Sequence, residues 1–171
     1  ISLSAHFDTL LGITEDELQS TFAQQITEMA EEYDVSKEEI QIKLKRQFDG
    51  YHFSRRMRGV YNPFSILRAF KEMLIDDYWF KTGSPTYLVR LLAHSDENIN
   101  ELVGKYYPTK DFDDYKATVE RPLPMIYQSG YLTIKGWSRN TNSYLLDFPN
   151  DEVRRGFISL LAADYLKPKV S

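Results

Sequence analysis

The chain has 171 residues, with 21 basic and 25 acidic side chains, a net charge of -4 and no cysteine. This length suits one domain or two small ones, and the lack of cysteine excludes a disulfide framework, a Cys-ligated zinc site and a thiol nucleophile. No run approaches the roughly 20 apolar residues of a membrane helix and no basic-then-apolar leader opens the chain, so we expect a soluble, cytoplasmic protein without a membrane partner.

Capping-box patterns begin the first two predicted helices. Thr14 is followed by Glu17, and Ser36 by Glu39, an arrangement in which side chains satisfy the free backbone amides of a helix start. Apolar residues then recur at helical spacing: Leu18, Phe22, Ile26, Met29 and Tyr33 in the first helix, and Ile40, Leu44 and Phe48 in the second. Because the link between the patterns is short, we predict a helical hairpin. Its first half is acidic and lacks Lys and Arg, which disfavours contact with nucleic acid there.

A small β-hairpin and two further helices are predicted next. Residues 51–61 place aromatic and β-branched residues on both sides of a polar, glycine-containing loop, which favours the hairpin. Asn62-Pro63 and Ser84-Pro85 are the same helix start used twice, since Asn and Ser cap free amides and proline suits the first helical position. The expected buried residues are Phe64, Leu67, Phe70 and Leu74 in the first of these helices, and Leu88, Leu91 and Leu92 in the second.

The last third of the chain has the element order of a winged helix. Residues 96–114 are polar, with a helical turn or two around Ile99, and we expect an irregular connection there. A short helix at 122–128 is followed by two strands, at 131–134 and 144–148, on either side of a polar turn. A final helix starts after an Asn cap, and the residues expected to be buried in it are Val153, Phe157, Leu160 and Leu161. The pattern as a whole predicts an α+β fold that is mainly helical.

Motifs for covalent or metal chemistry are missing from the sequence. It lacks GxxxxGK[ST], GxGxxG, HExxH, GxSxG and a calcium-binding loop, and its three histidines share no metal-ligand spacing. The closest approach to a nuclease motif, Glu39 with Lys43, falls on a predicted helix with the wrong spacing, so solvated charges are the simpler interpretation. We therefore predict no catalytic residue and no metal site in this chain.

Winged helices often bind DNA through the helix that precedes the wing. That helix here, PLPMIYQS, contains no Lys or Arg and offers little to base edges or phosphates. Lys135 and Arg139 in the wing are the candidates for contact with nucleic acid. For this helix, packing against protein is favoured over contact with DNA. For the chain as a whole, a DNA-binding winged-helix module and a protein-interaction scaffold without a nucleotide role are two alternative functions.

Six stretches in order resemble one family. LLGITEDEL, FDGYHFS, VYNPFSIL, YWFKTGSPTYL, IYQSGYLTI and LDFPNDEVRRGF are similar to segments of the bacterial AAA-ATPase-like family of predicted P-loop ATPases, often found upstream of a PD-(D/E)xK nuclease-like domain. The Walker A and Walker B segments of such proteins would lie before Ile1. The resemblance therefore implies a fragment that follows the nucleotide-binding core and is inactive as an ATPase alone.

The resemblance also assigns parts to the chain. It implies a helical lid-like region with a small hairpin at 1–95, the connection at 96–114, and a winged-helix-like module with a β-hairpin wing at 115–171. The complete protein would bind ATP or ADP with Mg, and its partners would be the missing N-terminal ATPase core and a C-terminal nuclease-like domain. TGSP resembles a Gly-x-Pro motif that lays proline on the adenine ring, which makes Gly83, Ser84 and Pro85 the cofactor-binding candidates. A plain Ser cap with proline in the first turn explains the same residues equally well.

Overall fold

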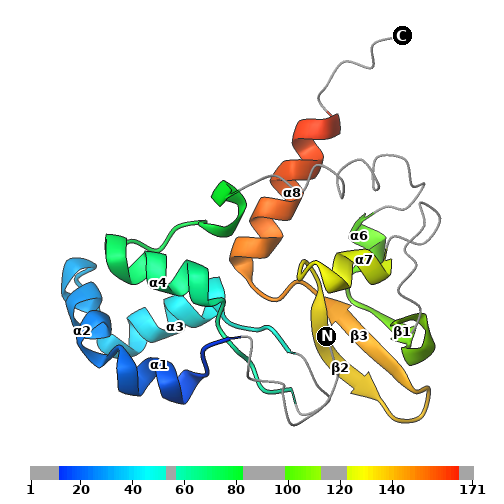
Figure 1. The fold of residues 1–171 in the computed structure, drawn as a ribbon, viewed down its shortest axis with the longest axis horizontal. Coiled ribbons are helices and arrows are strands. Elements are labelled where there is room, and N and C mark those ends of the chain that lie inside the picture. Colours follow the sequence, from blue (N-terminus) through cyan, green and yellow to red (C-terminus); the bar gives the residue numbers. More distant parts are fainter. Residues whose placement is uncertain (1–11, 53–56, 83–98, 113–122, 166–171) are drawn as a thin grey trace.

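Two hydrophobic clusters organise the part of the chain that the structure describes. A computed structural model describes residues 12–52, 57–82, 99–112 and 123–165. One cluster joins the N-terminal helices, and the other joins a small antiparallel sheet to the helices around it. Figure 1 shows the helical part on one side, the sheet on the other, and the start of the last helix between them. The prediction of a mainly helical α+β fold is confirmed.

The N-terminal helices form largely as the sequence predicts. They are α1 (Glu15–Thr21), α2 (Ala23–Glu32) and α3 (Lys37–Phe48). Thr14 and Glu17 make the reciprocal capping box, and Ser36 accepts a hydrogen bond from the Glu39 amide. The helix predicted after Thr14 is divided in two at Phe22, whose φ of -113° and ψ of 24° leave the helical region. The predicted core residues Leu18, Ile26, Met29, Ile40, Leu44 and Phe48 are buried.

The next helix, α4 (Pro63–Glu72), begins where predicted but buries a different face. The Asn62 side chain caps it, and Pro63 occupies the first turn. The residues that contact the core are Ser65, Ile66, Ala69 and Phe70, whereas Phe64, Leu67 and Leu74 are exposed. The predicted stripe was therefore wrong except at Phe70. Since the helix has apolar residues on two faces, periodicity alone could not select the one that meets α2 and α3.

The hairpin predicted at 51–61 is reduced to isolated bridges in the described residues. Tyr51 pairs with Val60, and Tyr61 pairs with Ile13 at the start of the described chain. After α4, the chain reaches the 3-10 helix η1 (Trp79–Thr82). The helix predicted to start at Ser84 lies outside the described residues.

The C-terminal part contains a three-stranded sheet. Its elements are α6 (Ile99–Leu102), β1 (Lys105–Pro108), the 3-10 helix η2 (Thr109–Phe112), α7 (Leu123–Gln128), β2 (Thr133–Ser138), β3 (Ser143–Asp147) and α8 (Asp151–Tyr165). The strands are antiparallel in the order β1-β3-β2, and β2 has an irregularity between Ile134 and Gly136. None of the helices in the described ranges combines the length and apolar character that crossing a bilayer requires.

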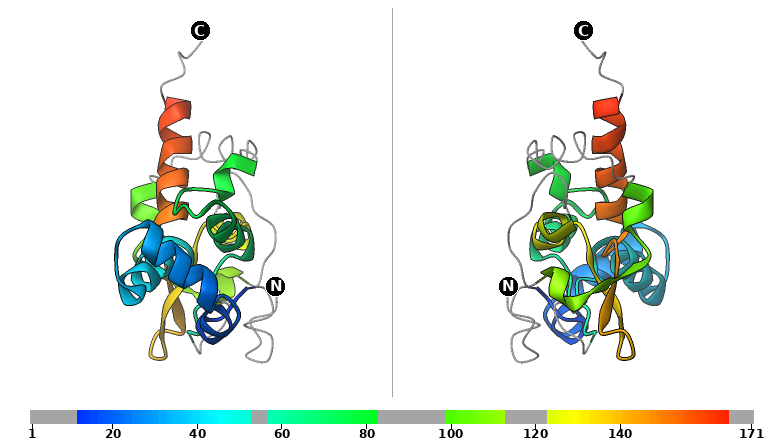
Figure 2. Two further views of the ribbon diagram at one scale, coloured as in Figure 1. Left: turned by 90° about the vertical axis from the view of Figure 1, so that its left-hand side faces the viewer. Right: turned by 90° about the vertical axis from the view of Figure 1, so that its right-hand side faces the viewer.

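Strand β1 corrects the expectation that residues 96–114 form an irregular connection. The helical turn around Ile99 is confirmed as α6, but β1 pairs with β3 and places Tyr107 opposite Tyr144. Residues 105–108 therefore belong to the sheet of the C-terminal part. In α8, Val153 and Phe157 are buried as predicted, and this helix contacts both α3 and η1. The two side views in Figure 2 show that the far end of α8 extends beyond the other helices and strands.

Candidate functional site

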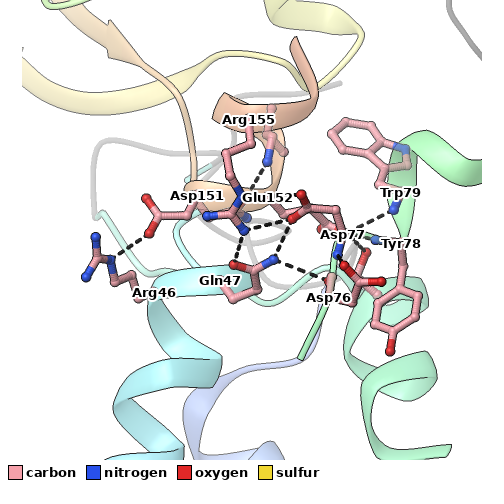
Figure 3. A network of polar contacts seen from close by, with 12 residues as sticks. Arg46, Gln47, Asp76, Asp77, Tyr78, Trp79, Asp151, Glu152 and Arg155 are labelled. Atoms are coloured by element: carbon pink, nitrogen blue, oxygen red, sulfur yellow. Dashed lines mark hydrogen bonds and ion pairs between the residues drawn. The ribbon is translucent and has the colours of Figure 1, made fainter. Parts of the chain in front are cut away.

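A buried carboxylate joins the start of α8 to the helical part. Oε1 of Glu152 accepts hydrogen bonds from the backbone amides of Tyr78 at 2.6 Å and Trp79 at 2.8 Å, and from Oγ of Ser65 at 2.9 Å. The Glu152 side chain therefore binds α4 and the segment that leads into η1 at one point (Figure 3). Because these residues are 73 to 87 positions away along the chain, the contact exists only in the folded state.

An outer layer of ion pairs surrounds this carboxylate. Arg155 of α8 binds both oxygens of Asp77, at 2.8 and 3.2 Å, and donates to Oε1 of Gln47 at 2.6 Å. Gln47 in turn donates to Oδ1 of Asp77 at 2.7 Å, which closes a three-residue ring. Arg46 pairs with Asp151 at 2.6 Å nearby (Figure 3). Positively and negatively charged side chains thus bind the start of α8 both to α3 and to the 76–79 segment.

Aromatic packing supports the same contact between the start of α8 and the 76–82 segment, which we call the seam. The ring of Trp79 stacks on Tyr131 with centroids 5.3 Å apart, and Phe80 is tilted against the same tyrosine at 5.6 Å. Gly156 of α8 makes room for Phe80, because a Cβ at this glycine would lie 2.1 Å from the phenylalanine ring. η1 is therefore pressed onto α8 by apolar contacts as well as by the Glu152 hydrogen bonds.

A second polar contact lies where α3 ends. Nδ2 of Asn150 donates to the Asp49 carbonyl at 2.9 Å, while its Oδ1 caps α8 by accepting from the Val153 amide at 3.0 Å. Nζ of Lys135, on β2, donates to the carbonyls of Gly50 at 3.1 Å and Pro149 at 2.8 Å. This lysine therefore links the end of α3, strand β2 and the turn before α8.

Burial shifts the pKa values of several groups along this seam. Burial raises the pKa of the Glu152 carboxyl, although three hydrogen bonds oppose the shift. Burial likewise raises the pKa of Asp49 and lowers that of Lys135. The pKa of His52 is lowered to about 4 by burial and by the charge of Lys135. Oε2 of Glu152 and Oδ1 of Asp49 are buried and have no hydrogen-bond partner within the described residues.

The structure changes the interpretation of the predicted nucleic-acid candidates. The Lys135 ammonium is directed to two backbone carbonyls inside the fold, so it is not displayed for phosphate, and the hypothesis that it contacts DNA is not supported. Arg139 is exposed in the turn between β2 and β3, with its guanidinium 5.7 Å from the centre of the Trp137 ring. The predicted cofactor-binding residues Gly83, Ser84 and Pro85 lie outside the described residues. Thr82, which the structure does describe, directly precedes them.

The groups of this site bind one another across the contact between α8 and the helical part. The described ranges contain no group of three or more His, Cys, Asp or Glu side chains that could hold a metal ion. Glu152 lies between two backbone amides and a hydroxyl of its own chain, and these donors occupy one of its oxygens. The arrangement holds the 76–79 segment and α4 against the start of α8.

Known proteins add little to this geometry. The chain is 27% identical over 176 aligned positions to a protein of Azotobacter chroococcum mcd 1 described as "Uncharacterized protein in vnfD 5'region". That alignment covers the whole of this chain but only 31% of the relative. No family model matches the chain, and no solved structure matches it.

Sequence reasoning missed the residues that make the seam. Glu152 precedes the core residue Val153 and lies four residues before Gly156, so it occupies the buried face of α8. An acidic residue on the apolar face of a predicted helix was the available signal. Asp77, Arg155 and Gln47 carried no comparable signal, because their pairing joins positions 30 to 108 residues apart.

Proposed function

We propose that this chain is the lid and winged-helix part of an AAA-ATPase-like protein. In this function it closes over ATP or ADP, with Mg, held by a P-loop core outside the chain, and relays the nucleotide state to an adjoining domain such as a nuclease-like domain. The proposal combines the six family-like stretches with the polar seam. It implies a cytoplasmic protein, which the absence of cysteine fits.

The observation that carries the proposal is the Glu152 contact with the amides of Tyr78 and Trp79. Trp79 begins η1, and η1 ends at Thr82, the residue before Gly83. A ligand that displaced Gly83, Ser84 or Pro85 would act on backbone only a few residues from the carboxylate of α8. Since a packed interface tends to shift as a unit rather than deform gradually, that displacement would reach the C-terminal part.

The length of the relative supports a role within a larger protein. More than two thirds of the Azotobacter protein lies outside its match to this chain, which leaves room for a nucleotide-binding core and a further domain. The proposal therefore requires GxxxxGK[ST] in the coding sequence before Ile1. A coding sequence without this motif would remove the proposed function.

A proline pair in the longer protein tests the nucleotide contact. Pro85→Ala should weaken the binding of a fluorescent ADP analogue about tenfold, because the ring that would lie on adenine is lost. Pro63→Ala is the matched control, since Pro63 occupies in α4 the first-turn position that the sequence predicts for Pro85. Equal affinities for both variants and the unchanged protein would contradict an adenine contact at Pro85.

Hydrogen exchange tests the relay. In the longer protein, ADP should slow amide exchange at Tyr78 and Trp79 and, in the same titration, at the first turn of α8. Glu152→Gln should reduce the second change relative to the first, because a neutral amide oxygen accepts the hydrogen bonds from Tyr78 and Trp79 more weakly than a carboxylate does. Slowing confined to the 76–82 segment in the unchanged protein would show that the nucleotide state is not relayed through α8.

A further inference from the structure

The segment between α4 and η1 is held in place by side chains of other elements. We call residues 74–79 the strap, and only the last of them, at the start of η1, belongs to a helix. The backbone amide of Ile75 donates to Oη of Tyr33, at the end of α2, at 2.7 Å. Nε2 of Gln47, on α3, donates to the Asp76 carbonyl at 3.3 Å. Two helices of the helical part therefore bind the strap through side chains.

The other end of the strap is bound by α8. Oε1 of Glu152 accepts hydrogen bonds from the amides of Tyr78 and Trp79 (Figure 3). In regular helices and strands, backbone amides are bound by other backbone groups. The amides of Ile75, Tyr78 and Trp79 depend instead on side-chain acceptors that α8 and the end of α2 supply.

Consecutive residues of the strap belong to different hydrophobic clusters. Tyr78, 2% exposed, is buried in the cluster of the N-terminal helices, where its ring stacks on Phe48 with centroids 6.3 Å apart. Trp79 packs against the cluster of the sheet and stacks on Tyr131. The other buried residues of the first cluster come from α1 to α4 and from Tyr61. Release of the strap would therefore leave the helices that build this cluster in place.

We infer that the strap opens as one unit while the rest of both clusters stays folded, which makes it a releasable link between the helical part and α8. Its three donors lie within five consecutive residues, so a displacement of the backbone at one of them carries the others with it. Short segments that bury few side chains open at a lower free energy than the core around them. The inference deepens the proposed function and rests on it only for the ligand that would act on the link, since the opening itself is a property of this chain.

Native-state hydrogen exchange of the unchanged chain, followed by NMR at low urea concentrations, tests the inference. The amides of Ile75, Tyr78 and Trp79 should share one opening free energy with a weak urea dependence, because the opening exposes little surface. Their protection factors should be at least about tenfold lower than that of the Leu44 amide inside α3. A different opening free energy at Ile75 would overturn the inference, since the bonds would then break separately. Values and urea dependences equal to those of Leu44 would also overturn it, because the strap would then open only with the whole protein.

Two tyrosine variants distinguish opening as a unit from local loosening. Tyr33→Phe removes only the hydroxyl that binds the Ile75 amide, but in a strap that opens as one unit it should speed exchange at all three amides by a common factor of about five. Tyr61→Phe is the matched control. The Tyr61 hydroxyl donates to Oε2 of Glu15 at 2.7 Å, a bond that stays intact when the strap opens, so exchange in the strap should not change. Faster exchange at Ile75 alone in Tyr33→Phe, or at none of the three amides, would contradict the inference.

The nucleotide role and the strap can fail separately. If Pro85→Ala leaves ADP binding unchanged while the three amides open together, the nucleotide role fails and the inference about the strap stands. If Pro85→Ala weakens ADP binding while the amides open independently, the inference about the strap fails and the nucleotide contact stands.

Discussion

Glu152 and Tyr78 are joined by a 2.6 Å hydrogen bond from the tyrosine backbone amide to the glutamate carboxylate, across 74 residues of chain. The same oxygen accepts from Trp79 and Ser65, so one side chain satisfies three donors from two segments. This contact fixes the start of α8 against the helical part. Together with the packing of Trp79 and Phe80 on Tyr131, it connects the segment before Gly83 with the C-terminal part.

Removing the Glu152 carboxylate should destabilise the protein strongly. Glu152→Ala leaves two backbone amides and a hydroxyl without their acceptor, and we expect a loss of about 3 to 5 kcal/mol in the free energy of unfolding. Glu152→Gln should cost less, because its amide oxygen can accept the same bonds. Urea denaturation followed by circular dichroism measures both. A cost below about 1 kcal/mol for the alanine variant would show that water replaces the carboxylate at this position.

The stability difference between the unchanged protein and Glu152→Gln should depend on pH. The folded-state pKa of Glu152 is raised above the value of 4.5 expected for the unfolded chain. The folded state therefore holds the proton of Glu152 more tightly than the unfolded chain does. The resulting contribution to the free energy of unfolding is fully present below pH 4.5 and is lost as the pH rises through the folded-state pKa. Denaturation of both proteins between pH 4 and pH 8 should show the unchanged protein losing stability relative to the glutamine variant. A constant difference would contradict the raised pKa.

Gly50 should tolerate no side chain. Its φ is +97°, and a Cβ there would lie 2.1 Å from the Pro149 carbonyl oxygen and 2.8 Å from Nζ of Lys135. Gly50→Ala should therefore destabilise the fold by about 2 kcal/mol or more through strain and a backbone clash. Gly104→Ala is the matched control, because Gly104 has a φ of +71° but no atom within 4 Å of its Cβ position, and about 1 kcal/mol is expected. Equal losses, measured by thermal denaturation, would show that the contact with Pro149 is relaxed in solution.

Substitutions at Lys135 and Arg139 should distinguish a structural role from contact with DNA. Lys135→Met keeps the aliphatic stem but leaves two carbonyls without their donor, so we expect a loss of about 1 to 3 kcal/mol in stability. Arg139→Ala, at an exposed position, should change stability by less than about 0.5 kcal/mol. Fluorescence anisotropy with a labelled DNA duplex at low salt checks the alternative function. Salt-sensitive binding that disappears in Arg139→Ala would support a DNA-binding wing.

His52 should titrate far below an ordinary histidine. Burial and the charge of Lys135 lower its pKa to about 4, whereas the unfolded value is near 6.5. The unfolded chain thus binds more protons between pH 4 and pH 6.5, and this residue makes stability rise with pH across that window. NMR titration of the imidazole carbons should find His52 still neutral at pH 5. A midpoint above pH 6 would show that the ring is hydrated.

Sequence alone determined the local elements whose signals lie within a few residues. Thr14 with Glu17, Ser36, and Asn62 with Pro63 all start helices as predicted, because a cap and its amides are neighbours in the chain. The apolar spacing of α3 also identified its buried side. The predictions for Gly83, Ser84 and Pro85 remain predictions.

Tertiary structure alone decided the buried face of α4, the place of β1 in the sheet and the Glu152 seam. α4 has two apolar faces, so only the positions of α2 and α3 select one. β1 is a short strand whose partners in β3 lie 35 to 41 residues later, and the donors to Glu152 are more distant still. Pairings of this kind depend on which surfaces meet when the chain collapses, and no local pattern of side chains records that outcome.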